Sequence, residues 1–291
     1  FLFVCQIAEL AGRTARVADM INIREERRKG CMSHWIDMHS HILPGMDDGA
    51  PTDEVAINMA IAAMRDGVDA VIATPHHANG IYENEAPAIM RAVDRLNELL
   101  QQRGISLQVL PGQEIRIHDR LLDDLAQMKL MGLNRTRYLL VEFPYGHLPS
   151  ASEDLFHELL VQDYVPVIAH PERNEVLSSN PDILARFIAM GALSQVTSRS
   201  LNGGFGFKAQ KSAFVMCRRK LCHFVASDAH NDGSRTIGLR EAYELLVRRL
   251  GTGIVEYFVQ NAESLRHGRE IAPPLFKVVR KRWFFLQKRR E

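Results

Sequence analysis

The segment Trp35-Ile36-Asp37-Met38-His39-Ser40-His41 decides how the rest of this chain is interpreted. An apolar run ends in two histidines that are two residues apart, and on an extended chain such side chains lie on the same face. Two imidazoles that project from the end of a strand can form half of a divalent metal site. A single His-x-His pattern is a weak signal, so its meaning depends on the residues farther along the chain.

Five more strand-like apolar runs each lead into residues of metal-binding type. These runs are 69–74 before His76, 107–110 before Glu114, 137–141 before Glu142, 165–169 before His170, and 223–227 before Asp228 and His230. Short apolar runs between chain-breaking residues are typical of buried parallel strands, although periodicity alone does not exclude buried helix.

Amphipathic segments of helical length lie between these runs, at 53–65, 87–102, 121–129, 151–162, 181–190 and 239–249. Strands that alternate with helices indicate a parallel sheet. If that sheet closes into a TIM-like barrel, the carboxyl ends of its strands converge on one site. We therefore predict a single α/β barrel domain at 34–272, an N-terminal extension at 1–33 and a C-terminal tail at 273–291.

Composition agrees with a soluble enzyme, and the four cysteines, which show neither zinc-type spacing nor a disulfide framework, favour a reducing cytoplasm. The 291 residues are 46% hydrophobic, enough for one large core, and the longest N-terminal apolar stretch, Phe1–Cys5, is too short to span a membrane. The net charge is +1, but positions 277–291 contribute +6 (seven basic groups and one acid) and positions 1–31 contribute +2, which leaves 32–276 at −7. An acidic body suits a site that gathers divalent cations and argues against nucleic acid as a partner.

Two other phosphate chemistries are excluded by the sequence. A cysteine-dependent phosphatase needs an arginine six residues after its nucleophile, and no arginine stands six residues after Cys5, Cys31, Cys217 or Cys222. The chain also contains no Gly-x₄-Gly-Lys-Ser/Thr loop, which argues against nucleotide-driven kinase chemistry. We expect Cys217 and Cys222 to be buried apolar residues.

The ordered motifs resemble those of the polymerase and histidinol phosphatase (PHP) family. They are His39-Ser-His41, Asp47-Asp48-Gly49, Thr74-Pro75-His76, Gly112-Gln-Glu114, Glu142-Phe143, Ala169-His-Pro-Glu-Arg173 and Ser227-Asp-Ala-His230. Within that family the chain resembles the bacterial manganese-dependent tyrosine-protein phosphatases of capsule and exopolysaccharide biosynthesis. The resemblance implies a distorted seven-stranded barrel that holds three metal ions, with Mn²⁺ preferred and Zn²⁺, Fe²⁺ or Mg²⁺ as alternatives.

The resemblance also implies a role for each site residue. The first ion would be bound by His39, His41, Glu114 and Asp228, the second by Glu114, Glu142 and His170, and the third by Asp48, His76 and His230. Arg173 and Arg235 would clamp the phosphate. These arginines are the predicted catalytic residues.

The implied chemistry is consistent with these residue types. Two metals about 3.5–4 Å apart can hold a bridging hydroxide that attacks phosphorus in line. Arginine presents a planar fork of donors that matches phosphoryl oxygens. The phenol of tyrosine has a pKa of about 10, so its phenolate leaves with little help from a general acid. We therefore predict hydrolysis of phosphotyrosine.

Several assignments have structural alternatives. In the pairs His76-His77 and Asp47-Asp48 only one residue is expected to face the site, and the motif register favours His76 and Asp48. Asp47 is either a general acid or a loop-capping residue. Glu142 could be a surface carboxylate, and each arginine could serve only in an ion pair or a loop.

Other functions share this metal site. The alternatives are a phosphoesterase acting on a small phosphomonoester such as histidinol phosphate or on a nucleic-acid 3′ end, and a non-catalytic metal-binding regulatory module. The expected partner is a phosphotyrosine protein, namely a membrane-associated bacterial tyrosine kinase. The basic and aromatic tail 277–291 is either a solvated or oligomer-packing extension or a segment that contacts the inner face of the membrane.

Overall fold

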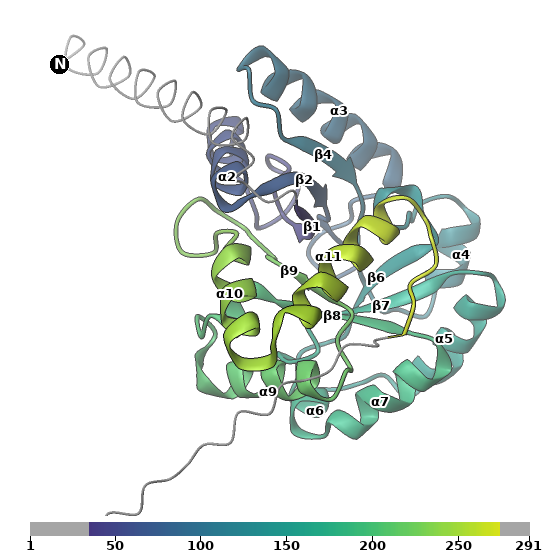
Figure 1. Ribbon diagram of the computed structural model, residues 1–291. Coiled ribbons are helices and arrows are strands. Elements are labelled where there is room, and N and C mark those ends of the chain that lie inside the picture. The colour runs from purple at the N-terminus through teal and green to yellow at the C-terminus, as the bar shows by residue number, and fades with distance from the viewer. Residues whose placement is uncertain (1–34, 274–291) are drawn as a thin grey trace, which may run out of the picture.

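The computed structural model describes residues 35–273, in which helices surround a set of parallel strands (Figure 1). The strands are β1 (Trp35–Ser40), β2 (Val68–Ala73), β3 (His76–His77), β4 (Gln108–Pro111), β5 (Glu114–Arg116), β6 (Tyr138–Glu142), β7 (Val165–Ala169), β8 (Leu193–Thr197) and β9 (Phe224–Ala226). Every pairing between these strands is parallel.

The strands form two hydrogen-bonded sheets, in the orders β1-β2-β4 and β3-β5-β6-β7-β8-β9. Two residues separate β2 from β3, and two separate β4 from β5. Each pair is therefore a single strand interrupted by a short break. A parallel bridge between Ser40 and Ala229 joins the end of β1 to the segment after β9. Counted in this way, residues 35–273 contain seven strands, and the segment after the last one lies beside the first. The predicted TIM-like α/β fold is therefore confirmed. Its hydrogen bonds are divided between two sheets.

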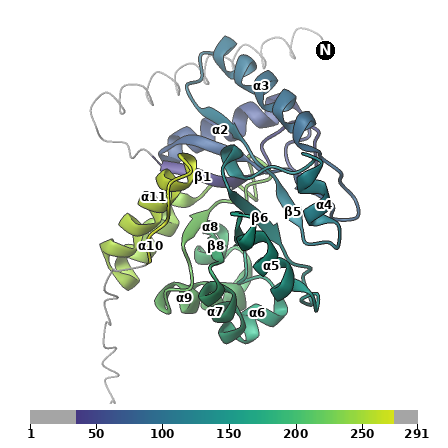
Figure 2. The same cartoon turned by 90° about the vertical axis from the view of Figure 1, so that its right-hand side faces the viewer.

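The helices cover the outside of the strands (Figures 1 and 2). They are α2 (Asp53–Asp66), α3 (Ala86–Gln102), α4 (Leu121–Ala126), α5 (Ser152–Val161), α6 (Glu175–Ser179), α7 (Pro181–Met190), α8 (Ser198–Leu201), α9 (Gly206–Arg218), α10 (Leu239–Leu250) and α11 (Thr252–Arg266), with a 3₁₀ turn η1 (Leu133–Arg135). All six helices expected from amphipathic patterning are present. The patterning did not identify β8, α6, α8, α9 or α11.

Local capping explains where helices begin and end. Thr52 accepts a hydrogen bond from the N–H of Val55 at the start of α2, and Gly67 ends the helix with φ of +99°. Asn180 caps α7 directly before Pro181, whose fixed φ suits the first helical position. These residues define both ends of α2 and the start of α7.

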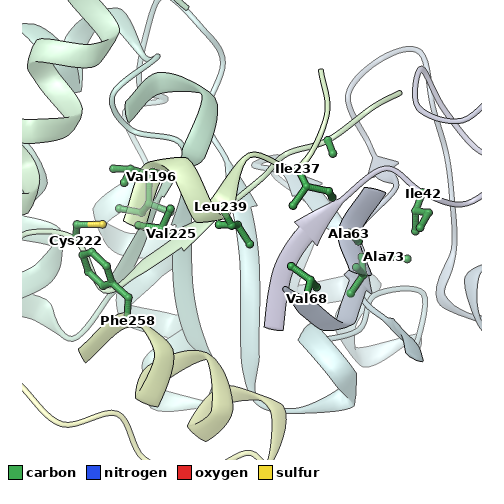
Figure 3. Packing of buried hydrophobic residues seen from close by; sticks show 14 of the residues in the cluster. Ile42, Ala63, Val68, Ala73, Val196, Cys222, Val225, Ile237, Leu239 and Phe258 are labelled. Carbon is green, nitrogen blue, oxygen red and sulfur yellow. The ribbon is translucent and has the colours of Figure 1, made fainter. Parts of the chain in front are cut away.

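The core lies between the strands and the surrounding helices. Figure 3 shows Phe258 of α11 beside Cys222 and Val225, and all three are buried. Helix α11 packs on β1 and β9, where the first and last strands meet (Figure 1). Each large apolar side chain buried in this way contributes about 1.5–3 kcal/mol. Cys217 and Cys222 are both buried and free, as expected.

Some predictions fall outside the described residues. The N-terminal extension 1–33 and the basic segment 277–291 belong to this group, as do Cys5 and Cys31. Between residues 35 and 273, no helix combines the length and the apolar character that a membrane crossing requires.

Candidate metal centre

The centre begins with the two histidines at the end of β1. His39 and His41 are fully buried, and their Nε2 atoms lie 3.2 Å apart. His39 Nε2 lies 3.3 Å from Glu114 Oε2 and 3.5 Å from Asp228 Oδ1. His41 Nε2 lies 3.3 Å from each of the same two oxygens. Side chains from β1, β5 and the loop after β9 therefore converge within the reach of one ion.

Two further groups of metal-type atoms adjoin this one. His41, Asp48, His76 and His230 offer atoms that all lie within 4.8 Å of one another. His230 Nε2 and His76 Nε2 each lie 3.5 Å from Asp48 Oδ1. Asp48 is half exposed, so this group opens toward solvent, whereas the first group is closed.

The remaining group is formed around Glu114. His76, Glu114 and Glu142 offer three atoms within 4.8 Å. His170 Nε2 lies 2.8 Å from Glu114 Oε1 and 3.9 Å from Glu142 Oε1. The structure thus gathers all nine sequence-predicted ligands, and His76 also approaches Glu142, a proximity that the sequence did not indicate.

Three histidines share a hydrogen-bonding pattern that leaves one nitrogen free for a metal. The Nδ1 atoms of His39, His41 and His230 lie 3.1, 2.6 and 3.0 Å from oxygens of Gln195, Asp47 and Asp228, respectively. A proton on Nδ1 makes each contact a hydrogen bond and leaves the Nε2 lone pair for coordination. This is the arrangement that histidine ligands adopt in metal proteins.

Unpartnered atoms provide a test of whether these residues fit a metal. Glu114 Oε2 and His76 Nδ1 are buried, lie 3.0 Å apart, and have no hydrogen-bond partner among residues 35–273. Leaving such buried groups unsatisfied is costly. A divalent cation would satisfy both, and a mixed histidine and carboxylate set suits ions such as Mn²⁺, Fe²⁺ or Zn²⁺. The residues therefore fit the metals that the sequence implied.

The electrostatics keep the carboxylates ionised. Burial alone would raise the pKa of Glu114, but the charges of His39 and His76 hold it well below its ordinary value. The pKa of Asp228 is likewise well below the usual range, because His39, His41 and Arg173 outweigh the effect of burial. Glu114 and Asp228 therefore stay ionised, which is the form in which a carboxylate binds a metal.

The two predicted clamp arginines bind the outer oxygen of one carboxylate. Arg173 Nη1 lies 2.5 Å and Arg235 Nη2 3.0 Å from Asp228 Oδ2, whereas the histidines approach Oδ1. The two arginine side chains are 28% and 26% exposed, so they line the open side of the centre. Both arginines are therefore accessible from solvent at this side of the centre.

A strained backbone conformation directs two of the predicted ligands, His170 and Asp228, into the centre. His170 and Asp228 have φ of +32° and +53°, in a region that residues other than glycine seldom occupy. Each comes directly after a strand or its short extension, so the turn bends the side chain into the centre. Such strain is a feature of functional sites that the surrounding fold stabilises.

The structure also resolves the paired alternatives in the motifs. His76 faces the cluster, whereas His77 Nε2 lies 3.8 Å from Glu83. Asp48 faces His76 and His230, whereas Asp47 binds His41 and the backbone N–H of Gly49. Burial would raise the pKa of Asp47, but the charge of His41 and the hydrogen bond to it lower that pKa, so the contacts of Asp47 are those of a carboxylate that orients His41.

Sequence reasoning missed several supporting residues. Gln195 on β8 orients His39, and Arg116 donates to Glu142 Oε2 through Nε and Nη2, at 2.9 and 2.8 Å. Glu172 Oε1 accepts hydrogen bonds from Thr197 and Ser200 and so fixes the segment after β8. Glu172 lies within the quoted motif Ala169-His-Pro-Glu-Arg173 but received no role there. None of these residues was the ligand-type end of a predicted strand, so the strand-end pattern could not find them.

Comparison with known proteins assigns the chain to a family. A family model described as capsular polysaccharide synthesis, CpsB/CapC, matches residues 35–266. The chain belongs to the CpsB/CapC family. The matched residues include all of the metal-type residues and both arginines, so the resemblance drawn from the motifs is confirmed.

Individual CpsB/CapC relatives are similar along almost their whole length. The tyrosine-protein phosphatase YwqE of Bacillus subtilis is 45% identical over 250 residues, which cover 86% of this chain and 98% of YwqE. The putative tyrosine-protein phosphatase CapC of Staphylococcus aureus is 34% identical, and the match covers 86% of this chain and 99% of CapC.

A solved structure of the CpsB/CapC family has the same fold. It comes from the crystal structures of YwqE from Bacillus subtilis and CpsB from Streptococcus pneumoniae, described as unique metal-dependent tyrosine phosphatases. The match has a TM-score of 0.80 at 45% identity and covers 84% of this chain and 100% of the other.

Proposed function

We propose that this chain is a metal-dependent protein-tyrosine phosphatase of capsular or exopolysaccharide biosynthesis. The observation that carries the proposal is the buried cluster of histidines and carboxylates that meets two arginines at Asp228. The cluster supplies ligands for cations, and the arginines supply ligands for a phosphate. The family and the 45% identity to YwqE, a tyrosine-protein phosphatase, give the substrate class.

The ligands are proposed for three ions, with Mn²⁺ as the preferred metal. They are His39, His41, Glu114 and Asp228 for the first ion; Glu114, Glu142 and His170 for the second; and Asp48, His76 and His230 for the third. Divalent ions held by these residues would supply a water of lowered pKa as nucleophile and would neutralise negative charge on the phosphoryl group.

The arginines bind and orient the phosphate. Arg173 and Arg235 approach the same carboxylate oxygen, so a phosphate that takes the place of this contact meets donors from two directions. Charge-assisted hydrogen bonds of this kind gain strength as negative charge builds up on the phosphoryl oxygens. Both residues therefore touch the reacting group and are proposed as catalytic residues.

The leaving group needs little protonation. The phenol of tyrosine has a pKa of about 10, far below that of the serine hydroxyl, so phenolate is the better leaving group. The charge of His41 lowers the pKa of Asp47, which disfavours the protonated form that a general acid requires. A site that offers little protonation to the leaving group favours an aryl phosphate over an alkyl phosphate.

The physiological substrate is proposed to be a phosphotyrosine protein, namely a membrane-associated tyrosine kinase of polysaccharide export. The description of the family, capsular polysaccharide synthesis, supports the pathway in which such a kinase would act. Action at the inner face of the membrane would place the enzyme beside such a kinase. The basic and aromatic positions 277–291 carry the charge that contact with an anionic membrane surface requires.

The proposal is tested by comparing three substrates. Mn²⁺-loaded protein is given a phosphotyrosine peptide, the matching phosphoserine peptide and histidinol phosphate, and released phosphate is measured. We expect turnover selective for phosphotyrosine that is lost with a chelator and in Glu114→Gln. A preference for histidinol phosphate would replace the proposed substrate class, and metal binding without any turnover would indicate a regulatory module.

A further inference from the structure

A pocket of about 270 Å³ lies beside the clamp residue Arg173. Its lining includes Tyr145, Glu172, Arg173, Glu175, Phe205 and Lys208. Arg173 also contacts Asp228 of the metal centre, so this arginine forms a wall between the centre and the pocket. A molecule whose phosphate is held at Arg173 can extend directly into this pocket.

Phe205 is the side chain that connects the pocket to the arginines. Its ring centroid lies 4.6 Å from the Cζ of Arg173 and 5.9 Å from that of Arg235. Gly203 and Gly206 on either side have φ of +87° and +86°, a conformation that favours glycine. The turn before α9 therefore brings an aromatic ring against both phosphate-binding groups.

The charges around the pocket cancel. Glu172 and Glu175 oppose Arg173 and Lys208, so the lining has no excess of either sign for a charged ligand. Tyr145 and Phe205 add two aromatic surfaces from different loops. A neutral pocket with aromatic walls suits an uncharged ring, because aromatic pairs attract one another beyond simple burial of area.

We propose that this pocket is the subsite for the phenyl ring of the substrate phosphotyrosine, with Phe205 and Tyr145 as the residues that select an aryl ester. In this substrate a single ester oxygen separates phosphorus from the ring, so a phosphate held at Arg173 places the ring at the adjoining wall. A phosphoserine side chain has no ring and leaves both aromatic walls uncovered. The inference rests on the proposed function and gives it a structural basis for specificity.

Binding of two non-hydrolysable phosphonates tests the proposal. Benzylphosphonate carries the phosphonate and ring of a phosphotyrosine side chain, and methylphosphonate carries the phosphonate alone. Dissociation constants are measured by calorimetry on Mn²⁺-loaded full-length protein. We expect Phe205→Leu and Tyr145→Leu each to weaken benzylphosphonate about three- to tenfold relative to methylphosphonate, the range for losing an aromatic contact.

Phe207→Leu is the matched control, since this phenylalanine is two residues from Phe205 and is 79% exposed. It should leave both dissociation constants unchanged. Equal weakening of both phosphonates in Phe205→Leu would overturn the proposal, because Phe205 would then act only by holding the arginines. An unchanged preference in both leucine variants would also overturn it. Failure of the proposed function is a different result, in which the wild-type chain does not hydrolyse phosphotyrosine.

Discussion

Arg173 Nη1 lies 2.5 Å from Asp228 Oδ2, while Asp228 Oδ1 faces the imidazoles of His39 and His41. One carboxylate therefore joins the proposed metal centre to the proposed phosphate clamp. The arginine holds the outer oxygen in place, and the inner oxygen remains directed at the ligand cluster. Changes to either residue should affect both metal binding and turnover.

Arg173→Lys should lower kcat/KM for a phosphotyrosine peptide about 10²- to 10³-fold. Lysine keeps the charge but lacks the planar fork that matches a phosphoryl group, and losing one preorganised donor of this kind has about this effect. Steady-state kinetics at saturating Mn²⁺ measures the change. A variant with near-normal kcat/KM would show that Arg173 serves only to hold Asp228.

Removal of metal should destabilise the protein. The closed group of His39, His41, Glu114 and Asp228 is buried, and a ligand that binds only the folded state at about 100 times its Kd adds about 2.7 kcal/mol. Thermal unfolding with Mn²⁺ should therefore show a higher Tm than unfolding with chelator. Glu114→Gln should largely remove this difference, and a chelator effect of equal size in that variant would contradict the ligand assignment.

Asp47→Asn should weaken metal binding about 10- to 100-fold, the usual effect of losing the hydrogen-bond partner of a ligand. The Asp47 carboxylate lies 2.6 Å from His41 Nδ1, and asparagine can still accept from Gly49 but no longer offers an anion to the imidazole. Competition with a metal-binding dye gives the affinity. If instead kcat falls with unchanged metal affinity and the basic limb of the pH profile moves, Asp47 acts as an acid.

The strand-end pattern pointed to eight of the nine predicted ligands, because each of these lies at or shortly after the end of a buried apolar run and parallel strands end at the same edge. Asp48 lies in the loop between β1 and α2, and only the family resemblance indicated it. The strand-end pattern missed β8 because Leu193-Ser-Gln-Val-Thr197 is not a continuous apolar run. Gln195 on that strand was lost with it, although it orients His39. Phe205 gave no signal either, since its position beside Arg173 depends on tertiary structure. Chain order thus identifies residues at strand ends, and only the fold identifies the groups that support them.

Acid should destabilise the protein through the buried His223. Burial lowers the pKa of His223 to about 4, and its Nδ1 accepts a hydrogen bond from the N–H of Ser194. Between about pH 6.5 and 4 the unfolded chain therefore binds a proton at this position that the folded chain excludes. The contribution of the neutral His223 to the free energy of unfolding is therefore fully present above about pH 6.5. It falls by about 3 kcal/mol as the pH drops to 4.

His223→Asn retains an acceptor near the Nδ1 position and removes the titrating group. The free energy of unfolding of the metal-free protein, measured in urea from pH 7 to pH 4, should therefore fall less steeply in the variant than in the wild type. The other titrating groups are common to both proteins, so their effect cancels in the comparison. Parallel curves over this range would mean that water or a rearranged Ser194 accommodates the protonated imidazole inside the fold.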